Sequence, residues 1–185
     1  AAAATTSWTR FPMGKRKRRN ALPAPPSPPV TPGLVSPMRS VRAGVPRPEY
    51  AASGEPSSRA SRAIRTPEEI EAMRIAGHVA AEALIEVGNH VRPGVTSDEL
   101  DRIGHEFMVD AGAYPSTLNY RNFPKSLCTS VNEIVCHGIP DSRRLADGDI
   151  VNVDVTAFIE GVHGDTSCTF LVGDVDQESA DLVER

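Results

Sequence analysis

Residues 150–171 read IVNVDVTAFIEGVHGDTSCTFL, and this stretch decides the fold. Apolar and polar residues alternate along its first ten positions, which is typical of a strand with one buried face. Glu160-Gly161 fits a two-residue hairpin turn. Residues 162–172 are therefore expected to return as a second, antiparallel strand.

The hairpin places two carboxylates on one face of the sheet. With a two-residue turn, Thr156 opposes Asp165 and Ser167 opposes Asp154, so the aspartates lie diagonally, about 7–8 Å apart at the backbone. Side chains that lean inward from that distance can bracket two metal ions about 3.5–4 Å apart. A three-residue turn would place the carboxylates on opposite faces. Gly161 is expected to let the backbone bend beside this site, and Gly164 to allow close approach there.

Two other interpretations of these residues remain open. The aspartates could be ordinary polar residues on a solvated face, although Asp154 stands in a strongly apolar strand, where burial without a partner charge is costly. Asn152–Thr156 could also be a degenerate phosphotransfer loop of DxDxT type. Asn152 replaces the nucleophilic aspartate of such loops, which disfavours this interpretation.

Two helices are expected upstream of the hairpin. Thr66-Pro67-Glu68-Glu69 predicts a helix start, with apolar positions continuing to Val91 and Pro93-Gly94 ending the helix. A second capping box at Thr96 predicts another helix, which Gly112 closes. The apolar stripes of both helices are expected to face the core. Short strands are predicted at 127–131 and 134–136, and the opening of a further helix at 177–185.

The charge is distributed unevenly along the 185 residues. Residues 1–65 hold twelve Lys or Arg against two Glu, a net charge of +10, and eleven of the sixteen prolines. Such a segment has little apolar surface to offset the entropy of ordering, so a disordered, basic, Pro-rich extension is predicted over 1–65. Its basic run at 15–19 could contact phosphate or be a solvated charge run. Residues 66–185 carry a net charge of −14. No apolar run is long enough for a membrane helix, and three cysteines argue against a disulfide framework.

The acidic part resembles one known family, the type I methionine aminopeptidases. The resemblance runs in order from about Thr66 to Arg185. It rests on the segments TPEEIEAMRIAG (66–77), VRPGVTSDELD (91–101), KSLCTSVNE (125–133), CHGIP (136–140), DGDIVNVDVT (147–156) and GVHGDTSCTF (161–170). The Pro-rich extension is similar to that of the longer, actinobacterial-type members. The resemblance implies an α+β pita-bread fold, of which residues 66–185 would be the N-terminal half, with an antiparallel sheet and helices on one face.

The resemblance also implies roles for individual residues. Asp154 would bind one of two divalent ions (Co, Mn, Fe or Zn), Asp165 would bridge both ions, and His137 would contact the substrate and help to stabilise the transition state. A monovalent cation is expected near Asn132. The walls of a methionine pocket would come from Tyr120, Phe123 and Cys128, with Thr117 where other bacterial members have a cysteine.

The implied activity is metal-dependent removal of the N-terminal methionine from nascent proteins in the cytoplasm. The family takes one more histidine and two glutamates as ligands from its second half, so the 185-residue chain by itself is expected to be an inactive fragment. A proline-specific dipeptidase is a related alternative. A monomer is expected, with no membrane association and with ribosome contact through the basic extension. The alternative from another class is a pita-bread module without catalysis that binds ribosome, RNA or protein.

Overall fold

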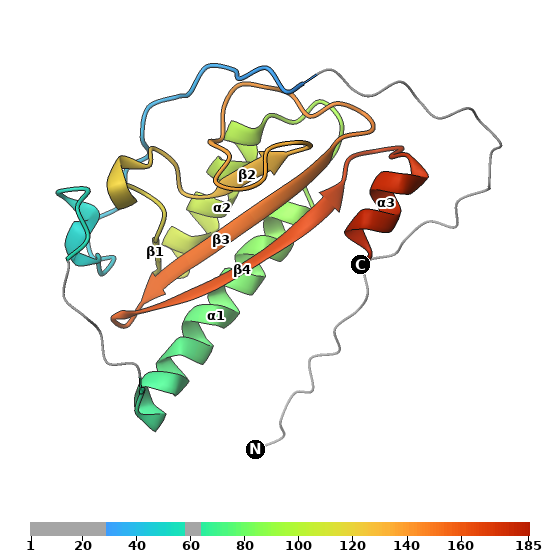
Figure 1. Ribbon diagram of the computed structural model, residues 1–185. Helices are drawn as coiled ribbons and strands as arrows, with labels where there is room; N and C mark the ends of the chain where they lie inside the picture. Colours follow the sequence, from blue (N-terminus) through green and yellow to red (C-terminus); the bar gives the residue numbers. More distant parts are fainter. Residues whose placement is uncertain (1–28, 58–63) are drawn as a thin grey trace.

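A computed structural model describes residues 29–57 and 64–185 of the chain. Its largest elements are two long helices and a four-stranded antiparallel sheet (Figure 1). In chain order the elements are η1 (Glu49–Ala51), α1 (Pro67–Gly88), α2 (Ser97–Asp110), β1 (Tyr114–Pro115), η2 (Tyr120–Asn122), β2 (Cys128–Val131), β3 (Ile150–Ile159), β4 (Val162–Leu171) and α3 (Gln177–Val183).

Strand β3 is the centre of the sheet. It pairs with β4 along its whole length on one side and with the short strands β1 and β2 on the other. Ile159 opposes Val162, as the two-residue turn predicted. Glu160 and Gly161 have φ values of 52° and 84°, both in the left-handed region that a type I′ hairpin turn requires.

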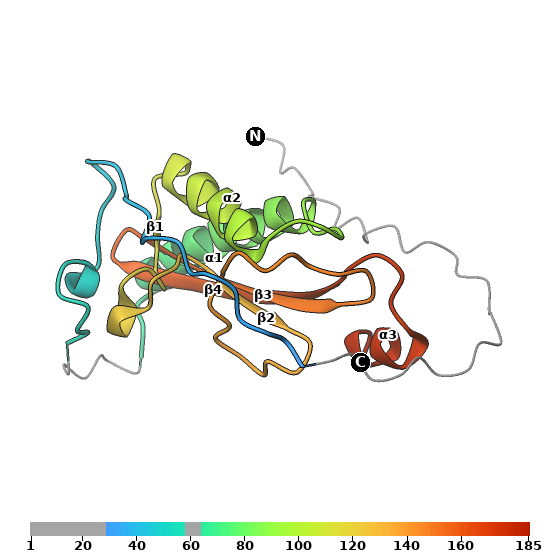
Figure 2. The same cartoon turned by 90° about the horizontal axis from the view of Figure 1, so that it is seen from above.

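Helices α1 and α2 cover one face of the sheet, and the core lies between the two layers (Figure 2). The side chains of Val151, Val153 and Val155 point into this core and are fully buried. The alternating polar residues of β3 are only partly buried on the opposite face. The predicted antiparallel sheet with helices on one face is therefore confirmed.

The capping signals fixed the starts of both helices. The Thr66 side chain accepts a hydrogen bond from the Glu69 amide, and the Glu69 side chain accepts one from the Thr66 amide. Helix α1 ends at Gly88, earlier than predicted, because the chain turns at Asn89 before it reaches Pro93. Its predicted stripe is also exposed at Ile70 and Met73, because the first turns of α1 project beyond the sheet (Figure 1).

The strand predicted at 134–136 is wrong. Asn132 adopts a left-handed conformation (φ 50°) at the end of β2, and the Ile134 amide donates to the Val131 carbonyl, so the chain turns out of the sheet. Val135 is 93% exposed in the loop that follows. Ile134 and Val135 are β-branched and therefore favour a strand by propensity. Among the described residues, however, no strand pairs with them.

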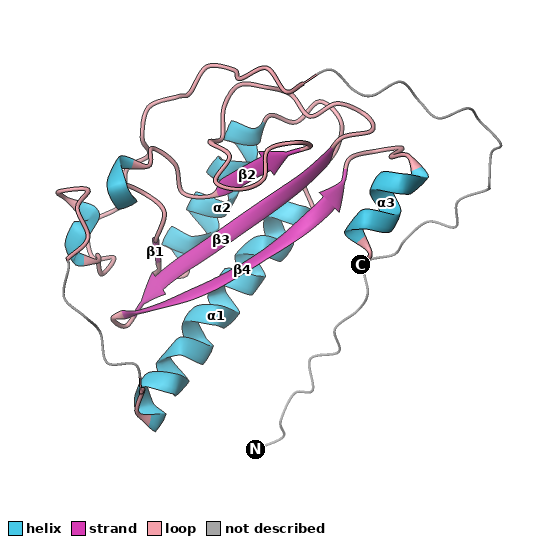
Figure 3. Ribbon diagram, in the orientation of Figure 1, coloured by secondary structure: helices cyan, strands magenta, loops and turns pink. Residues whose placement is uncertain are grey.

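Residues 30–57, which we call the N-terminal strap, correct the prediction of disorder over 1–65. The strap is irregular apart from η1 (Figure 3), yet Val41, Val45 and Tyr50 are buried. Val41 and Val45 pack in a second apolar cluster with Val109, Tyr114, Leu118 and Phe158. Because the segment is rich in proline, its composition did not reveal these few buried residues. Residues 1–28 and 58–63 of the predicted extension, including the basic run at 15–19, lie outside the described residues.

Polar contacts also hold the strap on the domain. Arg39 forms ion pairs with Asp98 (3.0 Å) and with the fully buried Asp101 (2.9 Å) on α2. Lys125 is fully buried, and its Nζ donates to Ser36 Oγ of the strap and to an Asp98 carboxylate oxygen. Because buried charges require partners, the strap completes a polar network in the domain.

Candidate metal centre

Asp154 and Asp165 lie on the face of the sheet that points away from α1 and α2. Asp154 opposes Ser167, and Thr156 opposes Asp165, so the two carboxylates have the diagonal relationship predicted from the sequence. Thr156 Oγ1 donates a hydrogen bond of 2.7 Å to Asp165 Oδ1 across the hairpin. This bond orients the Asp165 carboxylate.

The charge of Asp165 affects the ionisation of Asp154. Partial burial raises the pKa of Asp154, as do the negative charge of Asp165 and a hydrogen bond with it, while His137 acts in the opposite direction. Two carboxylates that disfavour each other's charge are stabilised by a cation between them. Hard divalent ions prefer such oxygen donors.

The chemistry of these donors therefore fits the ions that the sequence implied, but the set is incomplete. In residues 29–57 and 64–185, no group of three or more His, Cys, Asp or Glu side chains is arranged to hold a metal. A dinuclear site needs further donors beyond Asp154 and Asp165.

Cys128 lies directly opposite Asp154 in the neighbouring strand β2. Its thiol is buried, and this burial, followed by the charges of Asp154 and its neighbours, raises the pKa of Cys128 to about 12. The thiol is therefore neutral near pH 7. A neutral sulfur beside the carboxylates suits an apolar wall better than a ligand for a hard cation.

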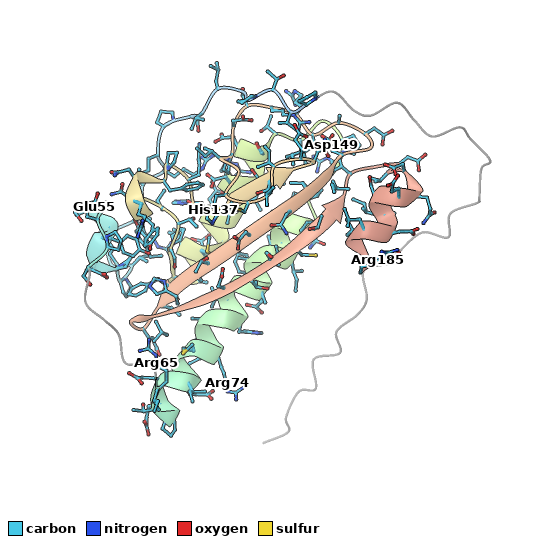
Figure 4. All side chains as sticks on the ribbon, in the orientation of Figure 1. Glu55, Arg65, Arg74, His137, Asp149 and Arg185 are labelled. Carbon is cyan, nitrogen blue, oxygen red and sulfur yellow. The ribbon has the colours of Figure 1, made fainter. Side chains whose placement is uncertain are left out.

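His137 is held over this face of the sheet by the loop that follows β2. It is an exposed, non-glycine residue in the left-handed region (φ 53°), and Figure 4 shows it over the middle of the sheet. The next residue fixes the loop, because Gly138 exchanges hydrogen bonds with β2 through Thr129 and Ser130. A Cβ at Gly138 would lie 2.1 Å from the Thr129 carbonyl oxygen, so only glycine fits. His137 thus lies close enough to influence the pKa of Asp154.

The two aromatic residues predicted for the pocket share one tight turn. Tyr120 begins η2 and is 40% exposed, and the half-buried Phe123 closes this element with a hydrogen bond to the Tyr120 carbonyl. Of the predicted residues, the structure brings Cys128 and His137 to the aspartates and keeps the aromatic pair together in the loop. Thr117, just before this turn, has a buried hydroxyl with no hydrogen-bond partner among the described residues.

Two aromatic neighbours of this region, Tyr50 and His163, were not among the predicted site residues. The Tyr50 ring contacts the edge of the Tyr120 ring, with 5.1 Å between centroids, and stacks with the imidazole of His163 at 6.4 Å. His163 also contacts Ser116 Oγ through Nδ1 at 2.9 Å. The alternation of β4 predicts that His163 shares a face with Asp165, whereas no sequence signal pointed to Tyr50.

Asn132 occupies one end of the same sheet face. Its amide group donates to Asp149 Oδ1 and its side-chain oxygen accepts from the Ile150 amide. It also lines a cavity of about 220 Å³ together with Ser130, Ile134, Val135, Ile150, Asn152 and Thr169. The predicted monovalent cation at this position remains a prediction.

The chain belongs to metallopeptidase family M24, whose family model matches residues 71–185. Among curated proteins, it is 58% identical over 156 residues to methionine aminopeptidase 2 of Mycobacterium tuberculosis, which covers 84% of this chain and 55% of that protein. It is 47% identical over 172 residues to the chloroplastic/mitochondrial methionine aminopeptidase 1D of Arabidopsis thaliana, covering 92% of this chain and 46% of the relative. The chain therefore spans about half the length of the relatives it matches.

Solved structures give the same assignment. The fold matches methionine aminopeptidase from Rickettsia prowazekii with a TM-score of 0.64 and 46% identity, over 65% of this chain and 49% of that one. A Xaa-Pro dipeptidase from Bacillus anthracis, at 23% identity, shares the fold with a TM-score of 0.56, over 65% of this chain and 32% of that one. The predicted pita-bread fold is thereby confirmed.

No helix among the described residues is both long and apolar enough to cross a membrane.

Proposed function

We propose that the complete gene product containing this chain removes the N-terminal methionine from nascent proteins with the help of divalent metal ions. The observation that carries this proposal is the pair of carboxylates, Asp154 and Asp165, on one face of a hairpin that lies within the residues matched by the M24 family model. Two relatives that support the proposal are named methionine aminopeptidases.

Each residue of the site has a task that fits its chemistry. When bound, divalent ions lower the pKa of a coordinated water, so that hydroxide is available near neutral pH. Asp154 and Asp165 hold the ions, and Thr156 fixes the orientation of Asp165. The imidazole of His137 donates a hydrogen bond that stabilises the oxyanion developing on the substrate. The buried, neutral thiol of Cys128 offers the polarisable, apolar surface that suits a thioether side chain.

Purified gene product should release methionine from a Met-Ala-Ser peptide in the presence of Mn²⁺ or Co²⁺. Asp165→Asn should abolish release and lower the bound metal measured by elemental analysis, because one bridging carboxylate is lost. Asp110→Asn is the matched control: it changes an aspartate that is 75% exposed and paired with Arg42, and it should leave turnover unchanged. Full activity of Asp165→Asn would exclude the bridging role.

The 185-residue chain by itself is proposed to lack this activity. The two aspartates leave the donor set incomplete in the part of the chain that the structure describes. Methionine release by this purified polypeptide would overturn the statement. A cytoplasmic location, a monomeric state and a monovalent cation at Asn132 belong to the same proposal.

The competing function is a binding module for ribosome, RNA or protein that performs no catalysis. The same assay decides between the two. Absence of methionine release in the metal-loaded gene product, with the metal present at the carboxylates, would favour the module.

A further inference from the structure

The loop that carries Tyr120 adopts a conformation that its sequence does not favour on its own. Asn119, Arg121 and Asn122 all lie in the left-handed region, with φ values of 62°, 49° and 64°. Each such residue costs free energy unless its surroundings enforce the conformation, and Arg121 lacks the local hydrogen bonding that eases this for Asn. Neighbouring contacts must therefore hold the loop.

The N-terminal strap supplies these contacts. The Arg121 amide donates a 2.8 Å hydrogen bond to the Gly54 carbonyl, and Asn119 Nδ2 donates to the Ala51 carbonyl at 3.0 Å. Gly54 lies against the loop so closely that a Cβ there would be 2.6 Å from Asn122 Oδ1. The loop is thus bonded to the strap on both sides of Tyr120, through the Asn119 side chain and the Arg121 backbone.

Tyr50 is the centre of this contact. It is only 3% exposed, and its hydroxyl donates a 2.7 Å hydrogen bond to the Ser116 carbonyl. One ring contact reaches Tyr120 and the other reaches His163, which shares the face of β4 with Asp165 two residues on. The phenol therefore connects the Tyr120 loop to the strand that carries the candidate metal ligand.

We propose that Tyr50 is a positioning residue for the methionine pocket. Tyr50 fixes the Tyr120 side chain relative to β4, and through Tyr50 the N-terminal strap sets the affinity of the pocket for the substrate side chain. This inference rests on the proposed function, because Tyr120 acts as a pocket wall only in that function. Tyr50 need not touch the substrate. Its contribution is to hold a strained loop in one conformation before substrate binds. The free energy of substrate binding is then not reduced by the cost of ordering the loop.

Two measurements test the proposal in the complete gene product. The first is hydrogen exchange of the amides of residues 119–123, which reports the loop without any catalysis. Tyr50→Leu removes both ring contacts and should speed this exchange at least about threefold, since an aromatic pair contributes about 0.5–1.5 kcal/mol. Gly54→Ala should have the same effect, because it displaces the loop from the other side.

The second measurement is steady-state cleavage of a Met-Ala-Ser peptide. Tyr50→Leu should raise KM about three- to tenfold and leave kcat within about twofold, because the loss concerns substrate binding rather than the reacting bond. Tyr50→Phe keeps both ring contacts and should keep most of the affinity. Val41→Ala is the control for strap stability: it truncates a buried strap residue whose apolar cluster has no member among residues 119–123, and it should lower Tm without changing KM.

The outcomes are distinct. If the parent protein releases methionine and Tyr50→Leu keeps its KM, the positioning role is wrong while the proposed function stands. If Val41→Ala raises KM as much as Tyr50→Leu, the effect is general destabilisation and the inference also fails. If the parent protein releases no methionine, the proposed function fails, and unchanged exchange in Tyr50→Leu would show separately that Tyr50 does not hold the loop.

Discussion

Thr156 and Asp165 face each other across the β3–β4 hairpin, and the threonine hydroxyl donates its hydrogen to the carboxylate at 2.7 Å. Asp165 would otherwise be an exposed side chain on an edge strand, free to rotate. The bond therefore orders the candidate ligand before any cation arrives.

Thr156→Val should weaken binding of Mn²⁺ to the complete gene product by about 10- to 100-fold, the usual effect of removing a group that orients a ligand. Isothermal titration with Mn²⁺ measures this effect. Thr166→Val is the matched control, because Thr166 lies next to Asp165 on β4 but opposes Val155 on the other face. Equal affinities for both variants would contradict the orienting role of Thr156.

Gly164 contacts helix α1 rather than the metal site, which corrects the expectation from the sequence. A Cβ at Gly164 would lie 2.2 Å from backbone atoms of Ala76 and Gly77. Gly164→Ala should therefore lower the free energy of unfolding by about 3 kcal/mol or more, because neither backbone can yield. Urea unfolding measures the change.

The neighbouring glycine of the same contact provides the control. A Cβ at Gly77 would meet nothing within 4 Å, so Gly77→Ala should stabilise the protein by about 0.5–1 kcal/mol through helix propensity alone. Destabilisation by Gly77→Ala, or a neutral Gly164→Ala, would show that α1 and β4 are not packed this closely.

Lys125 links the strap to the domain core. Lys125→Met keeps the length of the side chain but removes its bonds to Ser36 and Asp98, which should cost about 1.5–3 kcal/mol of stability, as is usual for hydrogen bonds to charged groups. Arg102→Met removes a half-buried cation from the same region, whose ion-pair partners among the described residues are Glu99 and Glu106 of its own helix. That control should change stability by less than about 1 kcal/mol.

His105 should make stability fall in mild acid. Burial lowers its pKa from the ordinary 6.5, and the hydrogen bond to the Ser40 carbonyl offsets this only in part. The unfolded state therefore binds a proton as the pH falls through 6.5, while the folded state does not, so the free energy of unfolding decreases below that pH and levels off only below the folded pKa.

Urea unfolding between pH 8 and pH 5 measures this dependence, which should not exceed about 1.4 kcal/mol per pH unit for one proton. His105→Gln should remove this part of the dependence. His78→Gln should keep it, because the His78 side chain is 67% exposed. The same pH profile in parent and His105→Gln would refute the role of His105.

The sequence by itself determined the hairpin, its register and the helix starts. These signals are local, and each acts within a few residues: the alternation along β3, the two-residue turn with positive φ values, the capping box at Thr66 and the threonine N-cap at Thr96. The position of Asp154 opposite Ser167 follows directly from that register.

Tertiary structure alone decided which segments meet. Tyr50 and Tyr120 are 70 positions apart, and no periodicity or composition relates them. The strap is fixed by a few anchors. Arg39 pairs with α2, Val41 and Val45 pack against residues of α2, β1 and β3, and Tyr50 contacts Tyr120 and His163. The many prolines of this segment hid these anchors in the sequence. His137 likewise reaches the aspartates only because Gly138 packs on β2. Local sequence specifies backbone conformation, whereas contacts between distant segments depend on packing that becomes visible only when the chain is folded.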